Sequence, residues 1–142
     1  MQSLFSRSSR ALLCVAVLGA AGTAQAATIE VRVTGVAGGK GKVAVAVCDK
    51  ATFLKDCLYS ATAPAKDGET VVTVKDVPAG TWAVLSYQDE NDNGQLDRNV
   101  IGIPKENYGF SRDARGRFGP PSFEDAAFAV SGETANAAVK LR

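Results

Sequence analysis

The fold of this chain is decided by the stretch Thr81-Trp82-Ala83-Val84-Leu85-Ser86-Tyr87-Gln88, which continues as Asp89-Glu90-Asn91-Asp92-Asn93-Gly94-Gln95-Leu96-Asp97. The first segment carries the only tryptophan and is rich in aromatic and β-branched residues, so residues 81–88 are predicted to form a strand. The second segment is a run of Asp and Asn side chains that ends this strand in a polar loop. Because the loop is entered from a strand, it is not the loop of a helix–loop–helix calcium hand.

Period-2 alternation of apolar residues predicts further strands on both sides of this stretch. Residues 28–36 alternate between apolar and polar side chains, whereas residues 43–48 are apolar on both faces and are expected to form a central strand. The two segments are joined by a glycine-rich turn and suggest a hairpin. Shorter strands are expected at residues 58–62, 70–75, 126–130 and 136–141.

These patterns predict an all-β protein. About seven short strands with turn signals between them, and almost no helical periodicity, are typical of an antiparallel β-sandwich. Residues 98–122 contain repeated glycine and proline and are predicted to be one long loop excursion from this sandwich.

The N-terminal segment predicts export. Residues 1–10 are basic, residues 11–21 form an apolar run too short to span a bilayer, and Ala24-Gln25-Ala26 resembles a signal-peptidase site. We therefore expect cleavage before Ala27, a periplasmic or secreted product without a membrane span, and one domain over residues 27–142. Intact-mass analysis of the exported protein checks this prediction; a mature N-terminus more than a residue or two from Ala27 contradicts it.

Charge and composition exclude several functions. The whole chain has a formal charge of +1. Loss of residues 1–26 removes Arg7 and Arg10, which leaves 14 basic against 15 acidic residues and a charge of −1. This balance gives no reason to expect binding to nucleic acid or to a membrane surface. The chain has no histidine, which excludes Ser-His-Asp and Cys-His catalysis and the usual catalytic zinc sites.

Two cysteines, Cys48 and Cys57, follow the signal segment. An oxidising compartment favours a disulfide between them. The alternative is a pair of buried free thiols, because spacing alone does not show that the two Cβ atoms face each other.

The Asp/Asn loop is a candidate calcium site. Asp89, Asn91 and Asn93 have the alternating spacing of the first ligands of a calcium loop, and Gly94 stands where such a loop turns sharply. The expected ligands are Asp89, Asn91, Asn93, Asp97 and the carbonyl of Gln95, with a weak affinity typical of extracellular sites. Two alternatives remain: a turn in which Asp and Asn bond their own backbone, and neutralisation of the acidic side chains by arginines.

The excursion gathers cationic and aromatic side chains. As a recognition surface they would bind an anionic glycan, a peptide or another envelope protein, because arginine and aromatic residues are favoured at contact hot spots. Alternatively the rings close the open end of the sandwich while an arginine neutralises the acidic loop. The candidate partner-binding residues are Tyr108, Phe110, Arg112, Arg115, Arg117 and Phe118.

A hydrolase is the alternative function. Asp89 or Asp92 together with Glu106 or Glu124 could act as an acid and base pair, as in glycoside hydrolysis. Nothing in the spacing selects a pair, so a binding or structural module of the envelope without enzymatic activity is favoured.

Three motifs resemble those of a bacterial secreted family catalogued as domain of unknown function 2141. They are Pro78-Ala79-Gly80-Thr81-Trp82-Ala83-Val84, the Asp/Asn loop, and Gly102-Ile103-Pro104-Lys105-Glu106-Asn107-Tyr108-Gly109-Phe110-Ser111. The resemblance implies an exported prealbumin-like or immunoglobulin-like sandwich of no established activity. That family usually has a histidine where this chain has Gln88.

Overall fold

The computed structural model describes Gly22 and residues 25–142. The signal peptide predicted over residues 1–26 therefore lies almost entirely outside the described residues, and its cleavage stays a prediction. Ala27, the expected first residue of the mature protein, is buried in the core. Within the described part of the chain, no helix is long and apolar enough to cross a membrane.

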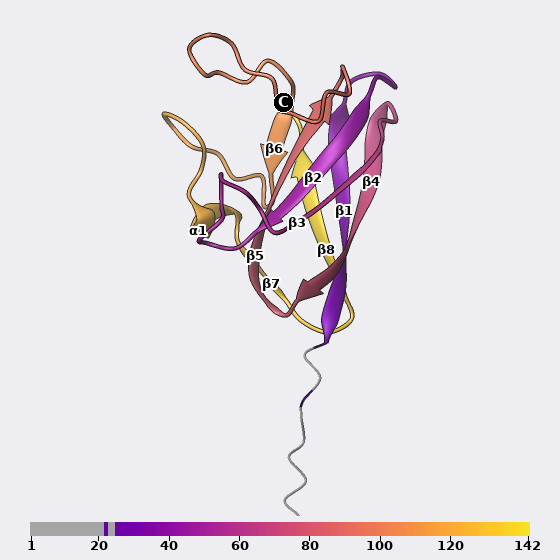
Figure 1. Ribbon diagram of the computed structural model, residues 1–142, viewed down its shortest axis with the longest axis vertical. Helices are drawn as coiled ribbons and strands as arrows, with labels where there is room; N and C mark the ends of the chain where they lie inside the picture. Colours follow the sequence, from indigo (N-terminus) through magenta and orange to yellow (C-terminus); the bar gives the residue numbers. More distant parts are fainter. Residues whose placement is uncertain (1–21, 23–24) are drawn as a thin grey trace, which may run out of the picture.

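All but one of the elements in the described residues are strands. In chain order they are β1 (Ala26–Val36), β2 (Lys42–Cys48), β3 (Tyr59–Pro64), β4 (Gly68–Pro78), β5 (Gly80–Asp89), β6 (Tyr108–Phe110), the single helical turn α1 (Phe123–Ala126), β7 (Phe128–Val130) and β8 (Thr134–Lys140). Two sheets pack face to face (Figure 1). The smaller sheet has the order β4-β1-β8 and the larger β3-β2-β5-β6, with β7 also paired to β5. The predicted all-β sandwich is confirmed.

Two strand pairings differ from the sequence-based expectation. The hairpin predicted from residues 28–36 and 43–48 is wrong, because β1 pairs with β4 and β8 whereas β2 pairs with β3 and β5. The glycine-rich turn instead carries the chain from one sheet to the other. The sandwich is otherwise antiparallel as predicted, except that β1 and β8 run parallel. Alternation decides which face of a strand is buried, but it does not identify the neighbouring strand.

The core between the sheets is built mainly from valines. Val31 and Val33 of the smaller sheet face Val45 and Val47 of the larger, and all four are buried. Trp82 closes one end of this core. Its indole Nε1 donates a hydrogen bond to the carbonyl of Pro78 at 2.9 Å, so the polar atom of the ring is satisfied.

The long excursion predicted over residues 98–122 is interrupted by a strand. Pairing of β6 with β5 divides it into an upper loop (residues 90–107) and an arginine loop (residues 111–122). The sequence hides this strand because β6 is too short to show alternation. The strand predicted at residues 126–130 also begins later than expected, since α1 ends at Ala126 and β7 starts at Phe128.

The predicted disulfide is present. Cys48 ends β2, and its bond to Cys57, with Cα atoms 4.7 Å apart, closes the disulfide loop (residues 49–56) over the outer face of the larger sheet. Replacing both cysteines by alanine is expected to lower the free energy of unfolding by about 2–3 kcal/mol, because the unfolded chain regains the entropy of the open loop. Urea unfolding measures the change. The reduced wild-type protein should match the double variant, and equal stability of the oxidised and reduced proteins would contradict the prediction.

Candidate functional site

The outer face of the larger sheet presents an aromatic floor. Along β5, Val84 points into the main core, whereas Leu85 and Tyr87 point outward. The register of β6 places Phe110 opposite Leu85 and Tyr108 opposite Tyr87. Because residues directly opposite in neighbouring strands share one face, these four side chains form a single continuous surface.

A small second core holds the loops around this floor. Phe53 of the disulfide loop packs against Phe110 and against Phe123 of α1, with ring centroids 5.9 and 5.8 Å apart. A capping box fixes the start of α1, in which the Ser122 hydroxyl accepts a hydrogen bond from the backbone N–H of Asp125. The disulfide loop and the end of the arginine loop are therefore anchored at their bases.

A groove of about 610 Å³ lies over the aromatic floor. The disulfide loop, the upper loop and the arginine loop enclose it from three sides, and in Figure 1 all three project to the left of the sandwich. Its lining is mostly apolar, with two cationic side chains. The lining residues are Leu54, Lys55, Leu85, Tyr87, Leu96, Arg98, Gly102, Ile103, Pro104, Tyr108, Phe110, Gly116, Gly119 and Pro120.

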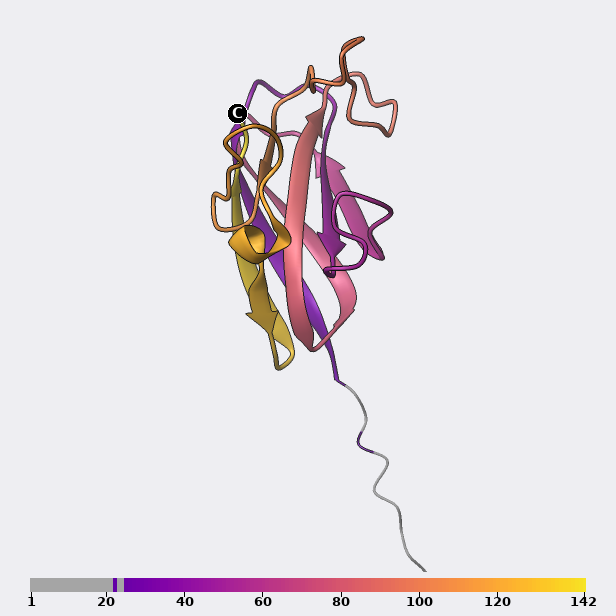
Figure 2. The ribbon, with the colours of Figure 1, turned by 90° about the vertical axis from the view of Figure 1, so that its left-hand side faces the viewer.

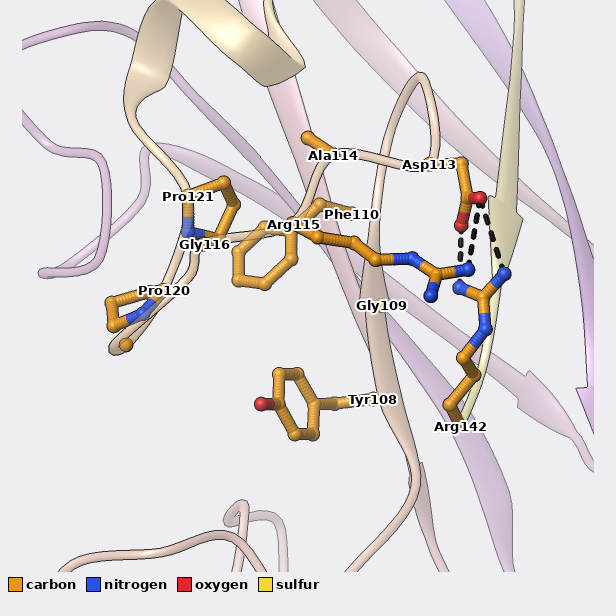
Figure 3. A pocket seen from close by; sticks show the side chains of 11 residues that line it. Tyr108, Gly109, Phe110, Asp113, Ala114, Arg115, Gly116, Pro120, Pro121 and Arg142 are labelled. Atoms are coloured by element: carbon orange, nitrogen blue, oxygen red, sulfur yellow. Dashed lines mark hydrogen bonds and ion pairs between the residues drawn. The ribbon is translucent and has the colours of Figure 1, made fainter.

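A smaller pocket of about 210 Å³ adjoins the groove and shares Tyr108, Phe110 and Pro120 with it. Figure 3 shows the rings of Tyr108 and Phe110 and the prolines on one side of this pocket, with Arg115 and Arg142 on the other. Both guanidinium groups donate to the carboxylate of Asp113. The hydrogen bond from Arg142 lowers the pKa of Asp113 to about 2, so this carboxylate is charged at neutral pH. Two guanidinium groups beside one carboxylate leave a surplus of one positive charge among these side chains.

The structure distributes the candidate partner-binding residues over three places. Tyr108, Phe110 and Arg115 line the pocket. Arg112 lies apart from it and donates to the carbonyls of Glu124 and Ala127. Arg117 and Phe118 lie at the tip of the arginine loop and line neither hollow.

The Asp/Asn loop is held by its own hydrogen bonds. The carboxylate of Asp89 accepts the backbone N–H groups of Asn93 and Gly94 at 3.1 and 2.8 Å. The carboxylate of Asp97 accepts the side-chain amides of Asn91 and Asn93 at 2.7 and 2.8 Å. Glu106 accepts the backbone N–H of Asp97 at 3.0 Å and ties the two ends of the loop together. The turn alternative describes this arrangement, since Asp and Asn side chains bond the loop backbone.

The candidate calcium ligands fit an ion only in part. Within the described chain, no three Asp, Glu, His or Cys side chains are arranged to hold a metal. Asn91, Asn93 and Asp97 do converge, but both amides turn their N–H groups toward Asp97. Rotation of each amide would present an oxygen instead. The carboxylate of Asp89 accepts a backbone N–H of the loop, and the backbone N–H of Gln95 donates to the side-chain oxygen of Asn93. Calcium binding by this loop stays a prediction.

The contribution of Asp97 to stability is expected to depend on pH. Hydrogen bonds from Asn93 and Asn91 lower the pKa of Asp97 below its usual 3.8. Because the pKa of Asp97 is lower in the folded than in the unfolded protein, its carboxylate stabilises the fold fully above pH 3.8, the unfolded-state value. This stabilisation is lost as the pH falls through the folded-state pKa. Asp97→Ala should therefore melt lower than the wild type near neutral pH, and this difference should shrink below about pH 4. Calcium binding would add a chelator-sensitive rise in melting temperature that Asp97→Ala lacks. Equal melting of the two proteins near neutral pH would contradict the structural role.

Two of the arginines that the alternative invoked to neutralise the acidic loop have partners elsewhere. Arg115 is paired with Asp113, and Arg112 bonds backbone carbonyls. Lysines meet the loop instead: Nζ of Lys42 of β2 lies 3.0 Å from Asp92, and the charge of Lys105 helps to lower the pKa of Asp97. The arginines follow the acidic loop closely in the sequence, which suggested that they pair with it. Strand β6 lies between them, however, and carries the chain away from the loop.

Sequence reasoning missed most of the groove. Leu85 and Tyr87 could have been found from their alternation with buried Val84, which places them on the opposite face of β5. No local signal identifies Arg142, which reaches the pocket because Arg142 and Tyr108 exchange backbone hydrogen bonds. Gln88, where related chains were expected to carry histidine, is fully buried and bonds the backbone of Ala37.

The fold and the site define a small all-β sandwich domain with loops gathered around a groove on the outer face of its larger sheet. The chain belongs to the family described as uncharacterized protein conserved in bacteria (DUF2141), whose model matches residues 31–138, and the resemblance noted in its motifs is thereby confirmed. The match runs from within β1 to within β8 and so covers the sandwich and all three loops. No significant match was found among curated proteins or among solved structures.

Proposed function

We propose that this protein is an exported, non-enzymatic binding module of the cell envelope that captures an acidic glycan in the groove and its adjoining pocket. The observation that carries the proposal is the adjacency of an aromatic floor to a pair of guanidinium groups. A sheet face that existed only to close the fold would not need a hollow of about 610 Å³ bounded by three anchored loops.

The chemistry of the two hollows is complementary to an acidic sugar chain. The half-buried rings of Tyr87 and Tyr108, with buried Phe110 beneath them, offer flat apolar surfaces of the kind on which sugar rings stack. Arg115 and Arg142 project from the next pocket, where a guanidinium fork matches a carboxylate in shape and charge. Lys55 of the disulfide loop and Arg98 of the upper loop add positive charge to the lining of the groove.

The hydrolase alternative receives no such support. Glu124 is paired with Lys50, an interaction that lowers its pKa, and Asp92 is paired with Lys42. Glu106 holds the backbone of the upper loop. A general acid needs a raised pKa, and each carboxyl group with a shifted pKa in the described chain is shifted downward: Asp49, Asp97, Asp113 and Glu124.

The test is titration of the mature protein with a tetramer of galacturonic acid, followed by NMR or calorimetry. Arg115→Gln is expected to weaken binding about tenfold, since it removes one charge-assisted contact. Arg32→Gln is the matched control, because Arg32 pairs with Glu69 at the surface of the smaller sheet. A galactose tetramer should bind more weakly. Equal binding of the acidic and neutral tetramers, or equal loss in both variants, would refute the proposal.

A further inference from the structure

Large apolar side chains stand fully exposed at the tips of two loops. Val100 and Ile101 at the turn of the upper loop are 105% and 75% exposed, and Phe118 of the arginine loop is 104% exposed. Exposed apolar groups of this size, gathered on one side of a protein, mark an interaction surface.

The two tips belong to the same side of the molecule. Both loops line one groove through residues that flank the two tips, Gly102 and Ile103 in the upper loop and Gly116 and Gly119 in the arginine loop. In Figure 1 both project to the left of the sandwich, and Figure 2, which turns that side toward the viewer, shows the arginine loop in front with the upper loop above it. A flat surface approaching from this side would therefore meet the two tips first.

The stem of the upper loop holds its tip in a defined shape. Arg98 forms a β-bridge with Pro104, and Asn99 accepts the backbone N–H groups of Ile101 and Ile103 through its side-chain oxygen. The tip is thus a compact turn that holds its apolar side chains outward, so little conformational freedom would be lost when a partner covers them.

Positive charge accompanies the exposed apolar groups. Residues 98–118, which carry both tips, contain five basic and two acidic side chains, a net charge of +3, whereas the two loops as a whole contain five of each because Glu90, Asp92 and Asp97 precede the upper tip. The acids of the upper loop lie toward its base, where Asp92 pairs with Lys42 and Glu106 bonds the backbone. Arg98 flanks the upper tip and Arg117 precedes Phe118. Apolar tips flanked by basic side chains are a pattern of proteins that bind the surface of anionic membranes.

We infer that the tips at Val100-Ile101 and Phe118 insert into the interface of an anionic lipid membrane, while the surrounding basic side chains face the lipid headgroups. Charge complementarity selects this partner over a neutral bilayer. The inference is independent of glycan capture, because the tip residues Val100, Ile101 and Phe118 line neither hollow.

Sedimentation with vesicles tests the inference on the mature protein. Vesicles of equal parts phosphatidylglycerol and phosphatidylcholine should bind it, vesicles of phosphatidylcholine alone should not, and high salt should reduce binding. The double variant Ile101→Ser/Phe118→Ser is expected to bind about tenfold more weakly, because each change removes apolar area from the interface. Val71→Ser is the matched control, since Val71 is also exposed but lies on the smaller sheet.

A second measurement does not depend on loss of binding. In the Phe118→Trp variant, fluorescence should shift to the blue when anionic vesicles are added, whereas Trp82 in the core should give no such shift in the wild type. Three results would overturn the inference: no sedimentation with anionic vesicles, equal binding to neutral vesicles, or equal loss in Val71→Ser and the tip variant. Unchanged binding of the galacturonic acid tetramer by the tip variant would separate this site from the groove.

Discussion

Gly41→Ala is expected to lower the free energy of unfolding by about 3–5 kcal/mol, the largest effect of any single substitution considered for this protein. Gly41 has φ +67°, a left-handed conformation that strains any residue with a Cβ atom. A Cβ at this position would also lie 1.9 Å from the backbone oxygen of Asp89 and 2.8 Å from its carbonyl carbon. Both of these neighbours are backbone atoms at the end of β5, so no side-chain rotation relieves the overlap.

Gly38→Ala is the matched control for this prediction. Gly38 lies in the same turn with a similar φ of +59°, but nothing lies within 4 Å of the position of its Cβ. Only the conformational strain remains, and the expected cost is about 1 kcal/mol. Urea unfolding of the two variants measures both losses of stability, and their difference is the cost of the overlap between the new Cβ and the backbone of Asp89. Equal costs would show that the passage of Gly41 beside Asp89 is unimportant.

Gln88→Ala is expected to lower the free energy of unfolding by about 3–4 kcal/mol, through a cavity and three lost hydrogen bonds. The side chain is fully buried. Its oxygen accepts the N–H of Ala37 at 2.9 Å, and its amide donates to the carbonyls of Ala37 and Lys40 at 2.9 and 3.1 Å. One side chain on the larger sheet thereby holds the turn that connects the two sheets.

In Gln88→Ala the turn at residues 37–41 is itself expected to lose stability. Hydrogen exchange at residues 37–41 should accelerate more than exchange in the core strands, because these amides lose their anchor. Gln95→Ala is the control, since Gln95 is exposed in the Asp/Asn loop and its side chain makes no hydrogen bond in the described chain. A similar loss of stability in both variants would contradict the anchoring role of Gln88.

Much of the fold was predictable because it depends on local pattern. Alternation identified β1 and β4, and aromatic and β-branched content identified β5. The doubly apolar segment at residues 43–48 is indeed a central strand, between β3 and β5. The cysteine pair was also predictable from number and compartment. In contrast, β6 was missed because it has three residues, with Gly109 at its centre. The backbone of Gly109 passes so close to Lys140 that a Cβ atom on Gly109 would lie 2.2 Å from the carbonyl oxygen of Lys140.

The candidate site was predictable only in its ingredients. Tyr108, Phe110 and Arg115 were named from the clustering of aromatic and cationic residues, and they do line one pocket. Their companions Leu85, Leu54 and Arg142 come from distant parts of the chain. Of the exposed tip residues, only Phe118 was among the predicted partner-binding residues, because exposure is not visible in a sequence.

By itself the sequence determined the all-β class, the apolar faces and the polar loop after β5, since each follows from side-chain chemistry over a few residues; it favoured the disulfide, which the geometry of Cys48 and Cys57 then decided. Only the tertiary structure decided which strands are neighbours, that β1 and β8 are parallel, and that three loops enclose one groove. The physical reason is that strand partners and loop contacts depend on how two whole sheets pack, and residues such as Tyr108 and Arg142 meet only after both sheets have formed.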